Sequence, residues 1–271
     1  MRFRVNGELA YASTGGRRHQ AGQPWIVFLH GAGGNHLIWM QQSRSLAYDG
    51  FNVLALDLPG HFLSGGEAIS GVENQARWVL DAMTAAGCDR AVLVGHSMGG
   101  PIAVEAALAA PGRVAGIVFV ASAGTIPVNA RLIEMATGSE NDAIDAMMSW
   151  AHGPEAHVNV DSWPGKGHVD FAIDMMRRNR PGSLAVDLIN CAGYRDGLAH
   201  APRISCPTLC VFSTRDRMTP IANGRALADT LPRNRLVVLD DCGHMIPTEA
   251  PAVLTRQIRE FLLINNIRKQ G

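Results

Sequence analysis

Residues 91–100 read Ala-Val-Leu-Val-Gly-His-Ser-Met-Gly-Gly, and this stretch is the strongest indication of the fold. Its first four residues are apolar, which is typical of a strand buried on both faces of a sheet. A glycine-flanked group around Ser97 follows at once, and the alanine-rich run 102–110 is long enough for a helix. The stretch therefore predicts a strand, a tight turn and a helix, with Ser97 at the tip of the turn.

The two glycines that flank Ser97 fit a strained turn. A chain that passes from a strand into a helix within a few residues strains the residue at the tip, and side chains two positions away on either side would collide. Gly95 and Gly99 occupy those two positions. At such a tip the Ser97 hydroxyl is open to a substrate on one side and to a histidine on the other, which makes it a candidate nucleophile.

The overall composition narrows the class of protein. The chain has 271 residues, 47% of them hydrophobic, and its 24 basic and 24 acidic residues cancel. This supports a sizeable core, and because no basic run occurs, neither nucleic acid nor an anionic membrane is expected as a partner. The amino terminus lacks the apolar stretch of a secretory signal, and no apolar run reaches about 18 residues, so no membrane span is predicted. The five scattered cysteines are expected to be reduced thiols, which indicates a cytoplasmic protein.

Strand-like runs alternate with helical stretches along most of the chain. A hairpin is predicted around Asn6-Gly7, and buried strands are predicted at 25–29, 51–56, 91–94, 114–120, 207–212 and 235–239. Strands that alternate with helices predict an α/β fold, with a mostly parallel sheet flanked by helices on both faces. The segment 125–204 has no convincing strand. We therefore interpret 1–124 and 205–271 as two parts of one core domain and 125–204 as a helical cap insertion at the edge of the sheet where ligands bind.

His244 is the best candidate for the base that a serine nucleophile needs. It comes shortly after the strand predicted at 235–239, so it falls on a loop at the carboxyl edge of the sheet. His96 is next to Ser97 in sequence, and its side chain is therefore expected to point away from the serine.

Asp216 is the candidate for the acid that orients His244. It follows the strand that precedes the histidine's strand, so both lie at the same sheet edge. Asp240 and Asp241 lie at the end of the strand that leads to His244, and Asp57 opens a turn. We assign structural roles to these three.

Outside the segment 125–204, the sequence resembles the α/β-hydrolase superfamily. The motifs that carry the resemblance are His-Gly-Ala-Gly-Gly at 30–34, Asp-Leu-Pro-Gly-His at 57–61, Gly-His-Ser-Met-Gly-Gly at 95–100, Asp216 before Pro220, and Gly-His at 243–244 before Glu249 and Pro251. The order Ser97, Asp216, His244 is the order of the triad in that superfamily. The resemblance implies the α/β-hydrolase fold, with a nucleophile elbow at Ser97 and the activity of a serine esterase.

Acyl transfer also needs N–H donors for the negative charge on the former carbonyl oxygen, an oxyanion hole. One candidate is the backbone N–H of Met98, the residue after the nucleophile, at the start of a helix. The glycine-rich stretch 30–34 can bring backbone close to a ligand. The resemblance to the superfamily's His-Gly-x motif points to the N–H of Ala32 as the second donor, with Gly33 as the next choice.

These motifs predict a carboxylic ester hydrolase that forms an acyl-enzyme on Ser97, acts on a small to medium ester and uses no metal and no organic cofactor. A serine nucleophile argues against the haloalkane dehalogenases and epoxide hydrolases of the superfamily, which carry a carboxylate there. Two alternatives stay open. One is a carbon–carbon bond hydrolase of the ring-cleavage-product type, and the other is a small-molecule receptor on a hydrolase scaffold.

Two groups of side chains in the segment 125–204 bear on the substrate. A buried cation would favour carbon–carbon cleavage, because such substrates carry a carboxylate, and the candidates are Arg177, Arg178, Arg180 and Arg195. Large apolar residues predict either an apolar pocket or the core of the cap itself, and they are Met135, Met147, Met148, Trp150, Trp163, Met175 and Met176.

Overall fold

The computed structural model of the chain describes residues 1–158 and 166–267. Its strands are β1 (Arg2–Val5), β2 (Glu8–Ser13), β3 (Trp25–Leu29), β4 (Asn52–Asp57), β5 (Ala91–His96), β6 (Val114–Val120), β7 (Thr208–Ser213) and β8 (Asn234–Leu239). They form an eight-stranded sheet in the order β1-β2-β4-β3-β5-β6-β7-β8. β2 pairs antiparallel with β1 and β4, and all pairs from β4 to β8 are parallel. The predicted α/β fold with a mostly parallel sheet is confirmed.

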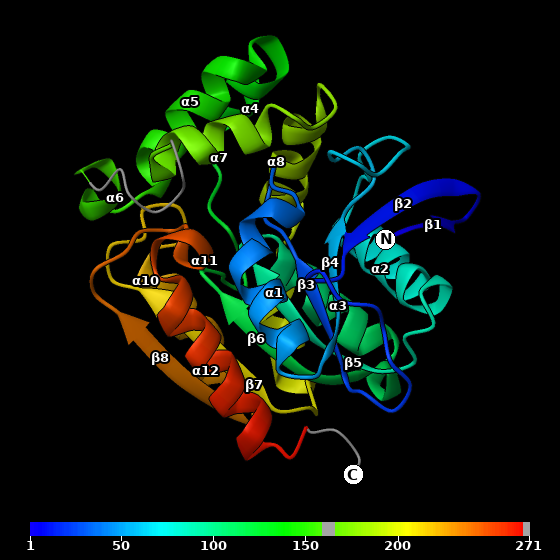
Figure 1. Cartoon of the computed structure of the whole chain (residues 1–271). Coiled ribbons are helices and arrows are strands. Elements are labelled where there is room, and N and C mark those ends of the chain that lie inside the picture. Colours follow the sequence, from blue (N-terminus) through cyan, green and yellow to red (C-terminus); the bar gives the residue numbers. More distant parts are fainter. Residues whose placement is uncertain (159–165, 268–271) are drawn as a thin grey trace.

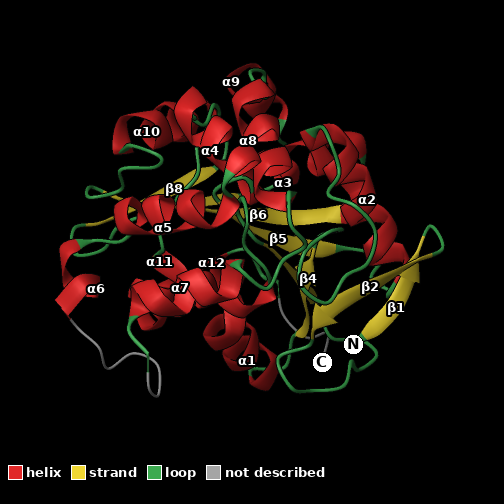
Figure 2. Cartoon of the chain, turned by 90° about the horizontal axis from the view of Figure 1, so that it is seen from above, coloured by secondary structure: helices red, strands yellow, loops and turns green. Residues whose placement is uncertain are grey.

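Helices cover both faces of this sheet. Those of the core are α1 (Met40–Tyr48), α2 (Val72–Ala85), α3 (Gly99–Ala109), α10 (Ile221–Thr230), α11 (Ile246–Glu249) and α12 (Pro251–Ile264), with the short 3₁₀ helices η1 (His36–Trp39) and η2 (Pro111–Arg113). Figure 2 shows α1 and α12 on one face and α2, α3 and α10 on the other.

The side chains of the central strands alternate between two apolar clusters, one on each face. In β3, Val27 and Leu29 pack in the cluster with α2 and α3, whereas Ile26 and Phe28 pack in the cluster with α1 and α12. Both faces of the strand are buried, which is why its sequence is a continuous apolar run rather than an alternating one. β8 is one of the two edge strands of the sheet. Its residues are half-buried, whereas the sequence predicted a buried strand there.

The predicted amino-terminal hairpin is present, with β1 and β2 joined by a two-residue turn. Asn6 and Gly7 occupy the centre of that turn with φ of +50° and +88°. Asn-Gly adopts this conformation readily, and its twist matches that of the two strands.

Between β6 and β7 the chain forms α4 (Ala130–Gly138), α5 (Glu140–Ala151), α6 (Pro154–Val158), α7 (His168–Met176), α8 (Ser183–Gly193), α9 (Gly197–His200) and the 3₁₀ helix η3 (Ala201–Arg203). We call residues 125–204 the helical segment. Its helices α4, α5, α7 and α8 lie beyond the carboxyl ends of the parallel strands (Figure 1). Trp163 lies outside the described residues.

The helical segment is packed onto the core rather than set apart from it. Ala143, Met147 and Leu184 belong to the same apolar cluster as α1 and α12. Within residues 1–158 and 166–267, no helix is long and apolar enough to cross a bilayer.

Candidate active site

The turn from β5 into α3 has the strained geometry that its sequence predicts. Ser97 has a φ of +51°, a conformation that side chains rarely adopt. A Cβ atom on Gly95 would collide with the backbone of Gly99, and one on Gly99 would lie 2.5 Å from the carbonyl oxygen of Leu29. Two hydrogen bonds to the Ser97 carbonyl oxygen stabilise the turn, one from the Gly100 N–H at 2.9 Å and one from the Ser122 hydroxyl at 2.8 Å.

His244 and Asp216 form a buried hydrogen-bonded pair. His244 Nδ1 lies 2.8 Å from Asp216 Oδ2, and the two residues are 5% and 6% exposed. The bond to the carboxylate places the ring proton on Nδ1 and leaves Nε2 as an acceptor. The other Asp216 contacts come from its own loop, where the N–H groups of Met218 and Thr219 donate to Oδ1 and the Thr219 hydroxyl donates to Oδ2.

This arrangement keeps Asp216 ionised. Burial alone would raise the pKa of its carboxyl group, but His244 and the hydrogen bonds from Thr219 outweigh burial and lower the pKa below its usual value. Asp240 lies elsewhere: it is exposed, and its Oδ1 accepts from the Thr214 hydroxyl at 3.2 Å. Asp216, and not Asp240, is therefore the aspartate that the structure brings to the His244 ring.

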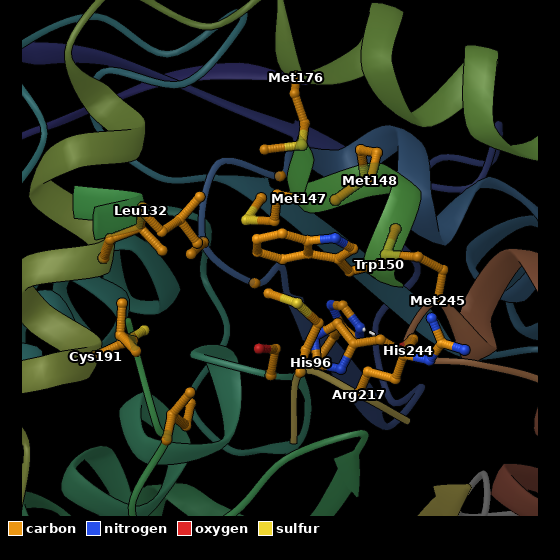
Figure 3. Close-up of a pocket in the computed structure, with 18 of the residues that line it drawn as sticks. His96, Leu132, Met147, Met148, Trp150, Met176, Cys191, Arg217, His244 and Met245 are labelled. Atoms are coloured by element: carbon orange, nitrogen blue, oxygen red, sulfur yellow. Dashed lines mark hydrogen bonds between the residues drawn. The ribbon is translucent and has the colours of Figure 1, made fainter. Parts of the chain in front are cut away.

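Ser97 and His244 line one cavity of about 400 Å³ at the carboxyl edge of the sheet (Figure 3). The oxyanion candidate Ala32 and the neighbouring Gly31 also line it. Among the described residues no hydrogen bond joins Ser97 Oγ to His244. Such contacts are often long until a substrate is bound, so the shared cavity is the relevant observation.

The walls of the cavity are apolar, and most of them come from the helical segment. Met147, Met148, Trp150, Met175 and Met176 line it. Sequence reasoning left open whether these residues form a pocket or the core of a cap. They do both, because all of them except Trp150 are also buried in the cluster shared with α1 and α12.

His96 braces the loop that carries His244, a role that sequence reasoning missed. Its Nε2 lies 2.9 Å from the His244 carbonyl oxygen, so Nε2–H donates. Burial and the neighbouring His244 ring lower the pKa of His96 to about 3, which keeps the ring neutral. Gly31 leaves room for this ring, because a Cβ there would lie 2.9 Å from His96 Nδ1 and 2.9 Å from Ser97 Cβ.

The same loop is tied to the helical segment through Glu249. One Glu249 oxygen accepts from the N–H groups of Gly153 at 2.8 Å and Gly243 at 3.0 Å, and the other accepts from Met245 at 3.0 Å. The His244 N–H donates to the carbonyl of Ala151 at 2.6 Å. The glutamate of the carboxyl-terminal motif therefore holds both sides of the His244 backbone.

The two predicted oxyanion donors are free to bind a ligand. Within the described residues, no hydrogen bond is recorded from the backbone N–H of Ala32 or Met98. The next choice, Gly33, is excluded as a free donor because its N–H donates to Asp187 Oδ2 at 2.9 Å. Met98 caps α3 at its amino terminus, where the helix dipole favours negative charge.

Asp187 is part of a buried ion pair next to the Ala32 loop. His61 lies with Nε2 3.0 Å from Asp187 Oδ2 and Nδ1 3.0 Å from the Pro59 carbonyl, so both ring nitrogens face acceptors. Burial lowers the pKa of His61, but Asp187 and the Pro59 carbonyl outweigh it and raise the pKa overall. The 57–61 motif contained His61, but no local pattern pointed to Asp187, which is 126 residues away.

Replacing Asp187 by asparagine is expected to lower the free energy of unfolding by about 3–5 kcal/mol, because it leaves a buried charge without its partner. Denaturant unfolding measures this. The control is Asp145→Asn, which breaks the half-exposed pair with Arg177 and should cost less than about 1 kcal/mol. Equal losses in the two variants would contradict a buried charged pair.

The pH dependence of this stability has a definite sign. Because folding raises the pKa of His61 above its ordinary value of 6.5, the bound proton stabilises the folded protein fully below that pH. The contribution is lost as the pH rises through the folded pKa. The stability gap between the wild type and Asp187→Asn should therefore narrow in alkaline solution.

Four arginines of the helical segment were candidate ligands for a substrate carboxylate, and none of them lines the cavity. They are Arg177, Arg178, Arg180 and Arg195. Arg177 pairs with Asp145 at 2.7 Å, Arg180 pairs with Glu67 at 3.0 Å, and Arg178 lies over the Phe62 ring. In the part of the chain that the structure describes, no group of three His, Cys, Asp or Glu side chains is arranged to hold a metal ion.

The profile of the alpha/beta hydrolase family matches residues 26–257. Among curated proteins, the 2-hydroxy-6-oxononadienedioate/2-hydroxy-6-oxononatrienedioate hydrolase 1 of Dechloromonas aromatica (strain RCB) is 26% identical over 260 residues, covering 89% of this chain and 88% of the relative.

Two solved structures share the fold over nearly the whole chain. The enol-lactonase from Burkholderia xenovorans LB400 superposes with a TM-score of 0.87 at 25% identity and covers 97% of this chain and 100% of that one. A thermophilic esterase from Thermogutta terrifontis has a TM-score of 0.83 at 23% identity, with 98% of each chain covered. Because the family profile extends from β3 into α12, the chain belongs to the alpha/beta hydrolase family of enzymes and is a hydrolase of that type.

Proposed function

We propose that this hydrolase cleaves a small to medium carboxylic ester through an acyl-enzyme on Ser97. The observation that carries the proposal is the buried His244–Asp216 pair, with its bond of 2.8 Å, at the cavity that the strained Ser97 also lines. A serine, a histidine with a free Nε2 and an acid on Nδ1 are the parts that acyl transfer requires.

The reaction proceeds in two halves. Ser97 Oγ attacks the ester carbonyl as its proton passes to His244 Nε2, and the N–H groups of Ala32 and Met98 stabilise the negative charge on the carbonyl oxygen. The alcohol leaves with the proton from His244, which gives the acyl-enzyme. Water then gives a proton to His244 and attacks the acyl carbon, and Ser97 leaves with that proton as the carboxylic acid is released.

The helical segment 125–204 acts as the cap of this site in our proposal. Its methionines adapt to irregular apolar groups, and a cavity of about 400 Å³ is in the size range of small-molecule sites. Short and medium acyl chains fit this description better than long ones.

A carbon–carbon bond hydrolase is the second candidate, favoured by the similarity to the curated relative from Dechloromonas aromatica, whose name describes a dioate substrate. That reaction would use a cation in the pocket. Among the lining residues that the structure describes, Arg217 is the one arginine or lysine, and it is exposed rather than buried. The described lining therefore contains no buried cation, and an exposed arginine at the rim is compatible with ester hydrolysis as well.

Hydrolysis of p-nitrophenyl esters from acetate to laurate tests the proposal. We expect rapid release with an optimum at short or medium chains. If no ester is cleaved while a fluorophosphonate still labels Ser97, ester hydrolysis is contradicted and carbon–carbon cleavage becomes the better hypothesis. An adduct that forms once without further turnover would favour the receptor.

A further inference from the structure

One arginine lies among the mostly apolar residues that line the cavity. Arg217 directly follows the triad candidate Asp216 and lines the cavity, where Figure 3 shows it on the same side as His244. Its side chain is exposed, and for residues 1–158 and 166–267 no ion pair or hydrogen bond of its guanidinium group is recorded.

The nearest acid in sequence is not available to neutralise Arg217. Both oxygens of Asp216 are occupied, Oδ1 by two backbone N–H groups and Oδ2 by the Thr219 hydroxyl and His244. The carboxylate is also buried, whereas Arg217 is exposed. Arg217 therefore keeps its charge free for a ligand, unlike Arg177 and Arg180 of the helical segment, which are paired with Asp145 and Glu67.

We propose that Arg217 selects substrates that carry a second carboxylate, so that the substrate class is the half-ester of a dicarboxylic acid. This inference rests on the ester hydrolysis proposed above. The ester group lies at Ser97, the methylene chain lies along the methionine-lined wall, and the free carboxylate binds the guanidinium group at the rim. Arginine suits this role because its planar group binds a carboxylate with two parallel hydrogen bonds.

Two esters of equal shape test the inference. Monoethyl adipate carries the carboxylate, and ethyl 6-methylheptanoate replaces it by an isopropyl group of similar size. The quantity measured is the ratio of kcat/KM for the two esters. In the wild type we expect the half-ester to be preferred, with the preference residing mainly in KM and declining as salt is added.

The Arg217→Gln variant should reduce that ratio about tenfold, since a charge-assisted hydrogen bond is lost. Arg217→Lys should recover part of it, because lysine retains the charge without the planar geometry. The matched control is Arg215→Gln, which removes an equal charge from an exposed arginine outside the cavity lining and should preserve the ratio. An unchanged ratio in Arg217→Gln, or an equal fall in Arg215→Gln, would overturn the inference.

A binding measurement separates this inference from the proposed function. Adipate should slow fluorophosphonate labelling of Ser97 in the wild type and lose that effect in Arg217→Gln. If neither ester is cleaved but adipate protects in this Arg217-dependent way, ester hydrolysis fails and the carboxylate site stands. If the esters are cleaved and adipate protects both proteins equally, the carboxylate site fails and the proposed function stands.

Discussion

Replacing Ser97 by alanine is expected to lower kcat/KM for a carboxylic ester by a factor on the order of 10³ or more. The substitution removes the atom that attacks the carbonyl and would carry the acyl group. What remains is the binding of the substrate and of its oxyanion, which accounts for a small residual rate.

Folding should survive this change. Alanine and serine are about equally strained at a φ of +51°, and the contacts recorded at the turn involve the backbone of residue 97. The measurements are ester turnover, fluorophosphonate labelling and thermal unfolding of the same preparations. Ser149→Ala, in an exposed position on α5, is the control and should leave turnover intact. A Ser97→Ala protein that retains most of its activity would rule out Ser97 as the nucleophile.

Replacing Asp216 by asparagine is expected to reduce kcat by a factor of about 10³–10⁴, in line with the loss of a triad carboxylate. The reason is the hydrogen-bond pattern around it. Two backbone N–H groups donate to Oδ1, so an asparagine must place its oxygen there and its NH₂ group toward His244. His244 Nδ1 then becomes an acceptor, the ring proton moves to Nε2, and the histidine can no longer accept the proton of Ser97.

The matched control is Asp240→Asn, because Asp240 is exposed and its recorded bond is to Thr214. It should change kcat by less than about twofold, since surface substitutions of this kind have small effects. The measurement is kcat of both variants at saturating ester, which shows which aspartate acts as the triad acid. A larger loss in Asp240→Asn than in Asp216→Asn would show that the acid is misassigned.

Local sequence patterns predicted the sheet well because they depend on short-range constraints. The apolar run 25–29 forms β3, and the glycines at 95 and 99 leave room for the turn at Ser97. The helix α10 lies in a stretch for which no element was predicted from the sequence, and Gly224 in its interior is a residue that disfavours a helix. In the fold this glycine lies against the ring of Phe212, where a Cβ would come within 2.7 Å, so packing explains a residue that local preference argues against.

The sequence allows only part of the candidate site, its triad and oxyanion donors, to be predicted. Ser97, Asp216 and His244 could be placed at one sheet edge because each follows a strand, and their catalytic roles stay a prediction. The position of a residue after a strand does not distinguish Ala32 from Gly33 as the second oxyanion donor. It depends on Asp187, 154 residues from Gly33 in sequence, which occupies the Gly33 N–H.

Local sequence patterns were sufficient to predict the α/β sheet and the position of Ser97 between a buried strand and a helix, because sterics and the period of apolar residues act within a few residues. The packed chain was needed to show which side chains line the cavity, which backbone N–H groups have no partner among the described residues, and that Arg217 lies beside His244. These features depend on contacts between segments far apart in the chain, such as the Glu249 bonds to Gly153 and Gly243. No local pattern encodes such a contact, because it forms only when helices and loops pack onto the same edge of the sheet.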